Sequence, residues 1–401
     1  MSADRDKLAS EGGAPTRAEF LPFALPQLGD AEKRAVVEVL DSGWITTGPR
    51  VGRFEEALGR SVGASHVVCV NSCTAALHLA LAALEVGAGD EVITSPLTFC
   101  STVNVVVHCG ARPVLADVEP DTLNLDPAQV QARIGPRTRA IVPVHFAGHP
   151  CEMDELREIA DRHGVPLICD AAHAIGARYR EQPIASLGDV TCFSFYATKN
   201  LTTGEGGALV TEDGALAERA RLLSQHGLAR DAWKRHGASG AWHYDVVLPG
   251  FKYNMTDLQA ALGLQQLERL ADFNARRREL TARYDAAFSA CEALECPAWR
   301  PEVDHAHHLY PLRLRLERLR IDRARFVEEL RLENIGTTVN FIPIHHHSFY
   351  REHLGLEPGA LPVAEAAYER LLSLPLYPAM SDADATDVIR AVEKVTRGFA
   401  R

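Results

Sequence analysis

The sequence predicts an α/β protein built on a mostly parallel sheet, with a smaller α+β domain at its C-terminal end. Short Val- and Ile-rich segments, among them HVVCV, DEVITS and VPLICDA, alternate with longer segments of helical periodicity. This alternation is typical of βα units whose strands lie parallel. Near Thr256 the pattern changes to a long helical stretch, which we expect to lead into the second domain.

We divide the 401 residues into a flexible, polar tail (1–20), a large domain (21–265) and a small C-terminal domain (266–401). Apolar spacing predicts a helix from Leu28 to Gly43, followed by the turn-rich loop GWITTGPRVG. In the small domain, HHLYPLRLRL and TTVNFIPI are interpreted as strands, and RARFVEELRLEN and the residues from Asp382 as helices.

The composition excludes several classes of function. The net charge is −11, and Lys and Arg are scattered, which disfavours a nucleic-acid or anionic-membrane surface. The N-terminal residues lack the apolar core of a secretory signal, and no apolar run approaches the roughly 18 residues of a membrane span, so we expect a cytoplasmic protein. The nine cysteines form no CxxC pair, which argues against a disulfide or zinc framework.

The first candidate for chemistry is Lys199, in the segment TCFSFYATKNLTTGEGGALV. A strand-like apolar run precedes this lysine and a Gly-rich turn follows it, whereas most lysines lie on solvated faces. The pattern therefore indicates an amine placed inside the protein, although a surface lysine is the alternative on local pattern alone.

The second candidate is Asp170, which ends the apolar strand of VPLICDAAHAIGA, with His173 three residues further on. A carboxylate buried there needs a cationic partner. The protonated nitrogen of a pyridine ring would serve, because an aspartate against it keeps the ring cationic and lets it withdraw electrons. Metal and nucleotide sites also use acidic residues at strand ends.

The third candidate is the start of the helix in VVCVNSCTAALHLALAAL, where Cys73, Thr74 and Ala75 offer free N–H groups to a phosphate. The alternative is that Ser72 or Thr74 only caps this helix. Phe99 is a candidate to stack on a cofactor ring, and Ser194 to bind the same phosphate. The main features follow successive strand-like segments, whose ends converge in a parallel sheet.

With these residues in place, the sequence resembles the DegT-type nucleotide-sugar aminotransferases, from about Leu21 to the C-terminus. The matching phrases include DSGWITTGPRV, NSCTAALHLAL, CDAAHAIGARY, FSFYATKNLTTGEGG and LPGFKYNMTDLQAALG. The likeness is greatest to the branch that aminates C4 of nucleotide-linked 4-keto sugars. It implies the three-layer sandwich of fold type I enzymes and the cofactor pyridoxal 5′-phosphate.

The resemblance assigns roles to individual positions. It implies that Lys199 is the Schiff-base lysine, that Asp170 faces the pyridine nitrogen and that His173 approaches the phenolic oxygen. Asn254 is contributed in the family by the neighbouring subunit, which implies a homodimer with shared active sites. The remaining cofactor contacts that it implies are Cys73, Thr74 and Ala75 with Ser194 at the phosphate, and Phe99 against the ring. Cys73 and Cys169 depart from the usual family residues, but neither position needs its side chain for the chemistry.

The loop FIPIHHHSFY resembles the family's substrate-facing segment. We expect no metal at its histidines, because consecutive residues cannot all point one way and no carboxylate or cysteine lies beside them in the sequence. The candidates for substrate contact are Trp44, Thr46, Thr47, Tyr196, Arg230, Lys252, His345 and His347, with His346 between the last two.

The expected reaction moves an amino group from glutamate to a nucleotide-linked 4-keto-6-deoxy sugar, giving a 4-amino sugar by a ping-pong mechanism. A sugar dehydratase is disfavoured, since such relatives replace the lysine by histidine and this chain keeps Lys199. Amination at C3, amination of a cyclic ketone such as a keto-inositol, and a non-catalytic regulator on the same fold remain alternatives. The motifs do not identify the sugar, its base or the stereochemistry of the new amine.

Overall fold

The computed structural model describes residues 7–228 and 245–401, and its core is a central, mostly parallel sheet. Its strands are β1 (His66–Val70), β2 (Glu91–Thr94), β3 (Arg112–Leu115), β4 (Thr138–Val142), β5 (Ile168–Asp170), β8 (Val190–Ser194) and β9 (Gly207–Thr211). They pair in the orders β3-β2-β4 and β5-β8-β9-β1. Two parallel bridges, Ile141 to Leu167 and Val144 to Asp170, join the segments of β4 and β5 and so connect the two groups. Within this sheet β9 runs antiparallel to both neighbours.

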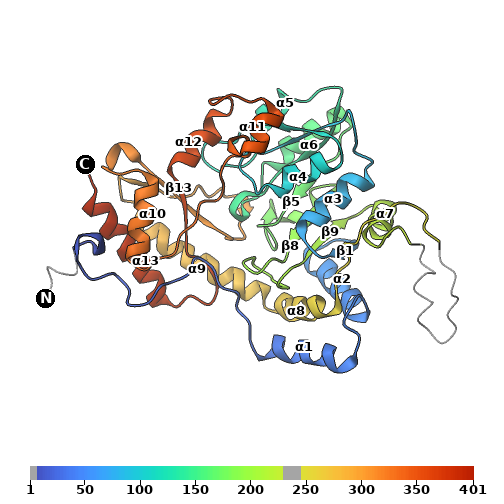
Figure 1. Ribbon diagram of the computed structural model, residues 1–401, viewed down its shortest axis with the longest axis horizontal. Coiled ribbons are helices and arrows are strands. Elements are labelled where there is room, and N and C mark those ends of the chain that lie inside the picture. Colours follow the sequence, from blue (N-terminus) through green and yellow to red (C-terminus); the bar gives the residue numbers. More distant parts are fainter. Residues whose placement is uncertain (1–6, 229–244) are drawn as a thin grey trace.

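Helices cover both faces of this sheet, so the large part of the chain has three layers (Figure 1). The helices are α1 (Asp30–Ser42), α2 (Pro49–Val62), α3 (Cys73–Ala83), α4 (Ser101–His108), α5 (Pro127–Gln131), α6 (Met153–His163), α7 (Gly214–Ser224) and α8 (Asp257–Glu268). Phe54, Leu156 and Ala260, from α2, α6 and α8, share one hydrophobic core. Leu77, Val106 and Leu216, from α3, α4 and α7, belong to the other. This arrangement confirms the predicted α/β class.

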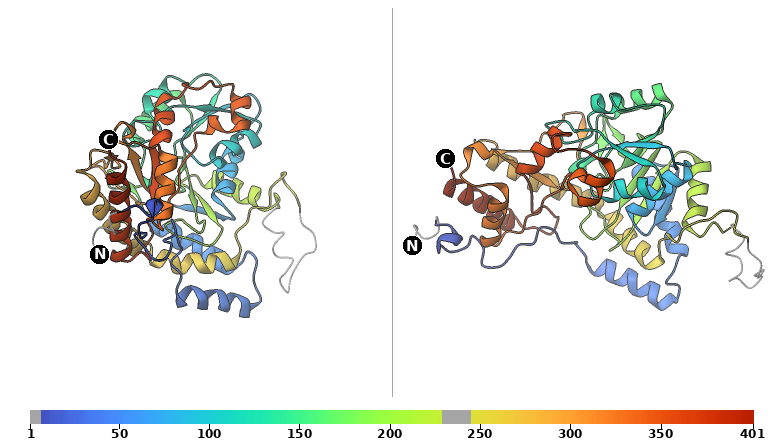
Figure 2. Two further views of the ribbon diagram at one scale, coloured as in Figure 1. Left: turned by 60° about the vertical axis from the view of Figure 1, so that its left-hand side comes forward. Right: turned by 45° about the horizontal axis from the view of Figure 1, so that its top comes forward.

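The C-terminal part has an antiparallel sheet and a hydrophobic core of its own, and lies beside the large part (Figure 2). Its strands are β10 (Leu294–Glu295), β12 (Tyr310–Leu314) and β13 (Leu371–Leu374), and its helices α9 (Leu270–Phe288), α10 (Arg323–Leu332), α11 (Ser348–Leu354), α12 (Pro362–Arg370) and α13 (Asp382–Gly398). A small sheet of β6 (Arg178–Tyr179), β7 (Gln182–Pro183) and β11 (Val303–Asp304) bridges the two parts. The division at residue 265 stays a prediction.

Residues 7–20 lie against the C-terminal part, which differs from the loose tail that the sequence suggested. The Leu8 side chain is 2% exposed within the core of that part. The N–H groups of Ala9 and Thr16 donate to the Glu333 carboxylate at 2.9 and 2.7 Å. Because the Glu333 side chain is buried, its oxygens need such donors, and the N-terminal segment provides them.

Two local expectations change in the structure. The loop GWITTGPRVG is shorter than expected, because α2 begins at Pro49, a position in the first helical turn where proline is well tolerated. The segment TTVNFIPI is not a strand: only Thr338 pairs, with Ser373, before a 3₁₀ turn at Ile344–His346. The helix at residues 30–42 is confirmed and ends at Gly43, whose φ of 72° is the left-handed conformation that glycine favours. None of the described helices combines the length and apolar character needed to cross a membrane.

Candidate active site

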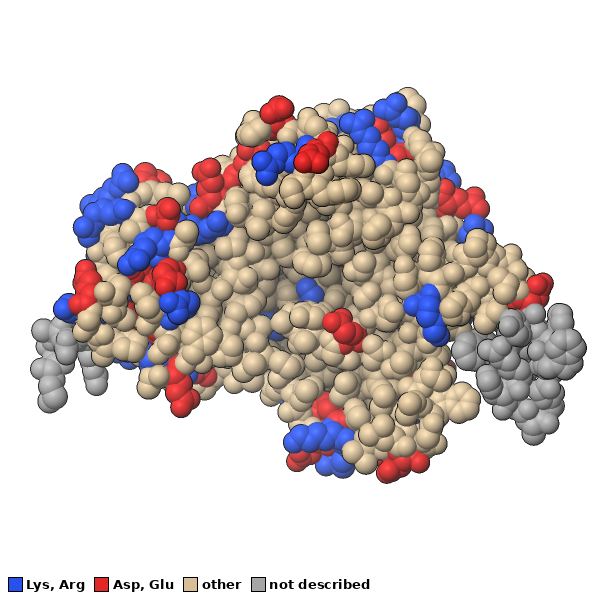
Figure 3. All heavy atoms as spheres, viewed as in Figure 1, with Lys and Arg blue, Asp and Glu red and all other residues tan. Residues whose placement is uncertain are grey.

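A cavity of about 480 Å³ lies at the carboxyl ends of the parallel strands. The face of the molecule in Figure 3 is hollowed near its middle, and its charged side chains gather towards the margin. Residues of both parts of the chain line the cavity, including Phe23, Cys73, Thr74, Thr98, Phe99, His145, Asp170, His173, Ser194, Tyr196, Lys199, His308, Asn340 and Phe341. The cavity therefore brings together most of the predicted cofactor residues.

The start of α3 forms one wall of the cavity. Ser72 caps this helix, because its Oγ accepts the N–H of Ala75 at 3.1 Å, as the simpler interpretation of this motif expected. Cys73 and Thr74 line the cavity, and the first N–H groups of a helix have no acceptor within it. Ala75 does not line the cavity, because its side chain is buried and its N–H is engaged by the cap. An anion fits against Cys73 and Thr74.

Gly207 explains the Gly-rich turn that follows Lys199 in the sequence. It begins β9 beside Ser194, and a Cβ at this position would lie 2.4 Å from the carbonyl carbon of Ser72 and 2.5 Å from the nitrogen of Cys73. Atoms at these separations overlap, so only glycine lets β9 pass so close to the first turn of α3. The turn therefore shapes the anion-binding wall.

Asp170 ends β5 with its side chain directed at the cavity and 5% of the residue exposed. Its Oδ2 accepts the Thr102 hydroxyl at 2.7 Å, and its Oδ1 accepts the N–H of Ala172 at 3.1 Å. Burial raises the pKa of this carboxyl, while the two hydrogen bonds and the nearby Lys199 oppose that shift. A cationic ring nitrogen in the cavity would favour its ionised form.

Lys199 lies in the loop after β8, where its N–H donates to the carbonyl of Tyr196 at 2.9 Å. Burial lowers the pKa of its amine to about 8; Cys73 and Asp170 oppose this shift, and Arg277 adds to it. A larger share of this amine is unprotonated near neutral pH than of an ordinary lysine. Such an amine is a nucleophile suited to an aldehyde.

The other predicted cofactor residues surround this pair. His173 is largely buried, and burial holds the pKa of its ring well below the ordinary value, so the ring is neutral. Ser194 points its hydroxyl at the cavity, where it accepts the N–H of Tyr196 at 3.4 Å. Phe99 is 61% exposed, and its ring lies 6.3 Å from that of Phe341.

Several predicted contacts lie away from the cavity of their own chain. Asn254 donates to the hydroxyl of Thr47 at 2.6 Å, and the indole of Trp44 donates to the carbonyl of Thr47 at 2.9 Å. Thr46 and Lys252 are exposed in the same neighbourhood, and none of these five residues lines the cavity. Tyr196 does line it and is half-exposed. Arg230 lies outside the described residues.

The histidine loop differs from its expected setting, because neither His345 nor His347 lines the cavity. A carboxylate does lie beside these histidines, contrary to the sequence argument: α12 brings Glu365 within 3.0 Å of His345 Nε2. His345, His346 and Glu365 offer ligand atoms within 4.8 Å of one another, so the premise for excluding a metal was wrong. The Glu365 carboxylate already accepts the N–H groups of Gly359 and Leu361.

The residues of the site that the sequence argument missed include Thr98, Thr102, His308 and Phe341. Thr102 follows Phe99 by three residues in the phrase TFCST. Its only signal in the sequence was its place near the start of the helix that follows the strand DEVITS. His308 lies two residues before the buried strand β12, a position where a polar ring is unusual. Phe341 lies in the segment that was taken for a strand.

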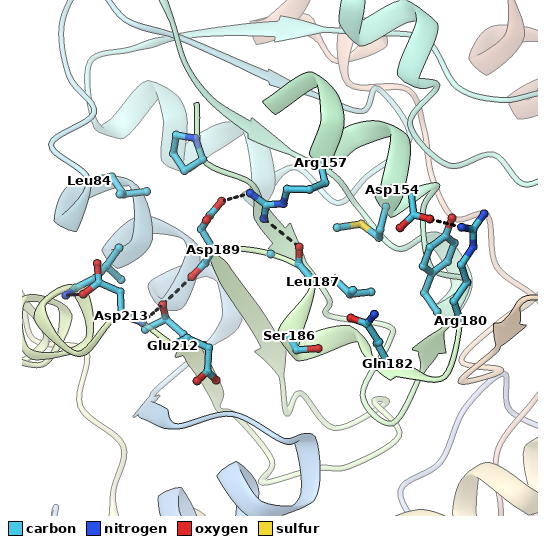
Figure 4. Close-up of a pocket in the computed structure, with 16 residues that line it drawn as sticks. Leu84, Asp154, Arg157, Arg180, Gln182, Ser186, Leu187, Asp189, Glu212 and Asp213 are labelled. Atoms are coloured by element: carbon cyan, nitrogen blue, oxygen red, sulfur yellow. Dashed lines mark hydrogen bonds and ion pairs between the residues drawn. The ribbon is translucent and has the colours of Figure 1, made fainter. Parts of the chain in front are cut away.

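A larger hollow, of about 840 Å³, lies near the amino ends of β5 and β8 and is lined by Pro166, Gly188 and Asp189, among other residues (Figure 4). Its charged groups are largely paired with one another: Arg157 contacts Asp189 at 3.0 Å and the carbonyl of Leu187 at 3.0 Å, and Arg180 pairs with Asp154. None of the described residues that line it is comparable to the lysine and buried aspartate of the cavity at the carboxyl ends. Size alone does not identify the active site.

The cavity suits a phosphorylated pyridine aldehyde: it offers an anion-binding helix start, a nucleophilic amine and a buried carboxylate. Solved structures agree with this fit. Spr1654 from Streptococcus pneumoniae in its PLP-form is 34% identical with a TM-score of 0.88, and the match covers 94% of this chain and 99% of that one. The fold and the site thus define a fold type I enzyme with pyridoxal 5′-phosphate as its cofactor.

The chain belongs to the DegT/DnrJ/EryC1/StrS aminotransferase family, whose model matches residues 26–393. It is 50% identical to the spore coat polysaccharide biosynthesis protein SpsC of Bacillus subtilis over 95% of this chain and 98% of SpsC. Helicobacter pylori PseC, an aminotransferase involved in the biosynthesis of pseudoaminic acid, matches with 29% identity, a TM-score of 0.87 and coverage of 95% and 100%. The protein is a sugar aminotransferase.

Proposed function

We propose that this enzyme transfers the amino group of glutamate to a nucleotide-linked 4-keto-6-deoxy sugar and releases the 4-amino sugar. The observation that carries the proposal is the meeting of Lys199, Asp170 and His173 in one cavity whose other described lining is mostly neutral. Hydroxyl, amide and imidazole groups suit a sugar. The choice of C4 rests on the likeness of the motifs to that branch of the family.

The proposed roles follow from the positions of the side chains. Pyridoxal phosphate, when bound, supplies an aldehyde for the amines and a ring that withdraws electrons from the reacting carbon. The Lys199 amine would hold the cofactor covalently until an amino donor takes its place, and would then carry the proton between the reacting carbon atoms. Asp170 would keep the ring nitrogen protonated, and Cys73, Thr74 and Ser194 would hold the phosphate. Because the donor's product leaves before the sugar enters, the kinetics are ping-pong.

The second part of the proposal is a homodimer with shared sites. Lys199 is the one Lys or Arg among the described residues that line the cavity, although glutamate and a nucleotide diphosphate both need cations. Asn254 and Lys252 lie away from their own cavity, so they are free to contact that of a second copy. Val37 and Leu40 on α1 are more than half exposed, which suits an interface.

Subunit mixing tests the shared site. Lys199→Ala and Asn254→Ala subunits, each inactive alone, are unfolded together, refolded and assayed. If the site is shared, one site of each mixed dimer carries both substitutions and the other carries none, so about a quarter of wild-type activity returns. Mixing each variant with itself is the control. No recovery in verified mixed dimers would contradict the sharing of Asn254.

The reaction is tested by absorbance spectroscopy of the cofactor-loaded protein. Glutamate should convert the spectrum to that of the amino form, and a nucleotide 4-keto-6-deoxy sugar should restore it. If only a 3-keto sugar or a cyclic ketone restores the spectrum, the substrate assignment is wrong while the chemistry stands. A cytoplasmic location belongs to the same proposal, and fractionation of cells tests it.

A further inference from the structure

His308 is the residue of the C-terminal part whose imidazole reaches the cavity beside His173. Its backbone is fixed from two sides. The N–H of His308 donates to the carbonyl of Ala147 at 2.9 Å, and its carbonyl accepts Nη1 of the buried Arg277 at 3.1 Å. His307, just before it, has a φ of 49°, a left-handed conformation that costs energy outside glycine. The position of His308 is therefore determined by contacts with both parts of the chain.

The hydrogen bonds of Asn200 settle which nitrogen of His308 carries the proton. Asn200 Nδ2 lies 2.7 Å from the carbonyl oxygen of Ala306, which can only accept, so this end of the amide is the donor. The other end, Oδ1, lies 2.9 Å from His308 Nδ1. Because Oδ1 can only accept, His308 Nδ1 is the protonated nitrogen.

It follows that His308 Nε2 is a hydrogen-bond acceptor without a proton. Burial holds the pKa of the His308 ring well below its ordinary value, with His173, Lys199 and Arg277 adding to the shift, so the ring stays neutral. Nε2 has no hydrogen-bond partner among the described residues, and it is not fully buried, so it is accessible from the cavity that His308 lines. This nitrogen therefore faces the cavity.

The neighbours of His308 place that acceptor next to the reacting groups. Its ring centroid lies 4.4 Å from that of His173, which is stacked on Phe341 on an almost parallel plane at 5.8 Å. Asn200, which orients the ring, is the residue after Lys199. A substrate that enters between Lys199 and His173 meets His308 Nε2 as well.

We propose that His308 positions the sugar, its Nε2 accepting a hydrogen bond from a sugar hydroxyl while the keto carbon faces Lys199. The inference rests on the proposed function and names a specificity residue for it. A sugar has several hydroxyl donors, whereas the carboxylates of glutamate can only accept and its amine is taken up by the reaction with the aldehyde. An acceptor without a proton therefore assists the sugar half-reaction and leaves the donor half-reaction largely unchanged.

The test compares both half-reactions in His308→Asn. The asparagine amide can still donate to Asn200 from near the position of Nδ1, but it leaves no acceptor at the position of Nε2. We expect kcat/KM of the sugar half-reaction to fall about tenfold or more, the effect of one lost hydrogen bond, and the glutamate half-reaction to stay within about twofold. The Kd of a nucleotide sugar with a hydroxyl in place of the keto group, measured by calorimetry, should rise in parallel.

Two further variants make the outcome specific. His308→Gln places an amide near the position of Nε2 and should recover part of the lost sugar affinity. His307→Asn is the matched control, because His307 does not line the cavity and asparagine tolerates its left-handed backbone. This control should leave both half-reactions unchanged.

The proposal is overturned if His308→Asn slows both half-reactions equally, which would show a structural role, or if it changes neither. Deoxy sugars give a second check: removal of the contacted hydroxyl should weaken wild-type binding and cause no further loss in His308→Asn. A deoxy series with the same losses in both proteins would also overturn it. A wild-type protein that aminates no nucleotide sugar contradicts the proposed function itself, before any variant is compared.

Discussion

Thr102 donates a hydrogen bond of 2.7 Å to Oδ2 of Asp170 and so joins the first turn of α4 to the end of β5. The hydroxyls of Thr102 and Thr98 also lie 2.7 Å apart, so Thr98 can donate to Thr102 while Thr102 donates to the carboxylate. Each donor in this chain favours the ionised form of a carboxyl that burial alone would protonate. In the role proposed for Asp170, this ionised form keeps the cofactor ring protonated and electron-withdrawing.

We therefore predict that Thr102→Val lowers kcat by about tenfold, since a hydrogen bond to a charged group contributes about 1.5 to 3 kcal/mol. The substitution keeps the shape of the side chain and removes the donor. Steady-state kinetics across pH should show the activity falling at a higher pH on the acidic side, because the pKa of Asp170 rises. Thr102→Ser keeps the hydroxyl and should retain most of the activity. Equal losses in both variants would refute the role of the hydrogen bond.

The lowered pKa of Lys199 predicts how cofactor attachment depends on pH. Only the unprotonated amine attacks the aldehyde, so covalent attachment should become faster as the pH rises through about 8 and not through the ordinary lysine range. The rate at which absorbance develops after mixing the apo-protein with pyridoxal phosphate measures this midpoint. Lys199→Ala should bind the cofactor without that absorbance and lose transamination. Lys33→Ala, on the exposed face of α1, is the control and should keep both the absorbance and the transamination activity.

Gly207→Ala should weaken cofactor binding and destabilise the fold by about 1 to 3 kcal/mol, because its Cβ overlaps the backbone of Ser72 and Cys73. Gly52→Ala is the matched control. A Cβ at Gly52 meets nothing within 4 Å, and alanine is the better residue in the interior of α2, so this variant should be as stable as wild type or more so. Urea unfolding and a cofactor titration measure both effects. Unchanged binding in Gly207→Ala would contradict the close approach of β9 to the first turn of α3.

Glu365→Gln should destabilise the protein by about 1 to 2 kcal/mol at neutral pH. Burial raises the pKa of Glu365, but hydrogen bonds from Gly359, His345 and Leu361 outweigh it and hold the pKa below the ordinary value. The stabilisation is therefore complete above the ordinary glutamate pKa of about 4.3 and disappears as the pH falls through the lower folded-state pKa. Unfolding of both proteins at neutral and acidic pH checks this.

A metal at His345, His346 and Glu365 would give a different result in the same experiment. If the Glu365 carboxylate only accepts hydrogen bonds from His345, Gly359 and Leu361 and binds no metal, a chelator should leave the unfolding midpoint and the activity of the wild-type enzyme unchanged. The difference between the unfolding midpoints of wild type and Glu365→Gln should also be the same with and without added zinc. A zinc-dependent gap between the two proteins would establish a metal site here.

The sequence predicted the parts of the site that depend on local pattern. Asp170 and Lys199 follow strand-like runs, and the ends of parallel strands converge whatever the details of packing, so their meeting in one cavity was foreseeable. The start of α3 was foreseeable for the same reason. The roles given to these residues stay predictions until the variants are measured.

What the sequence did not reveal depends on contacts between distant residues. His308 is tied to Asn200 across 108 positions, and Glu365 reaches His345 across 20, distances that no short motif spans. The segment TTVNFIPI alternates like a strand, yet it runs along the cavity wall, and Pro343 in it lacks the N–H that a strand would use. The contacts proposed for Asn254 and Lys252 involve a second copy of the chain, which one sequence does not describe.

The amide of Asn200, next to Lys199, is held by Asn274, Ala306 and His308, all made at least 74 residues later. On the ribosome, which delivers the N-terminal residues first, the strands through Thr211 emerge before any of these partners exists. The amide next to the reactive amine therefore gains the last of these partners only when His308 has been made. We expect a chain that stops before His308 to lack the contacts that orient Asn200 beside Lys199, even where the strands through Thr211 have formed.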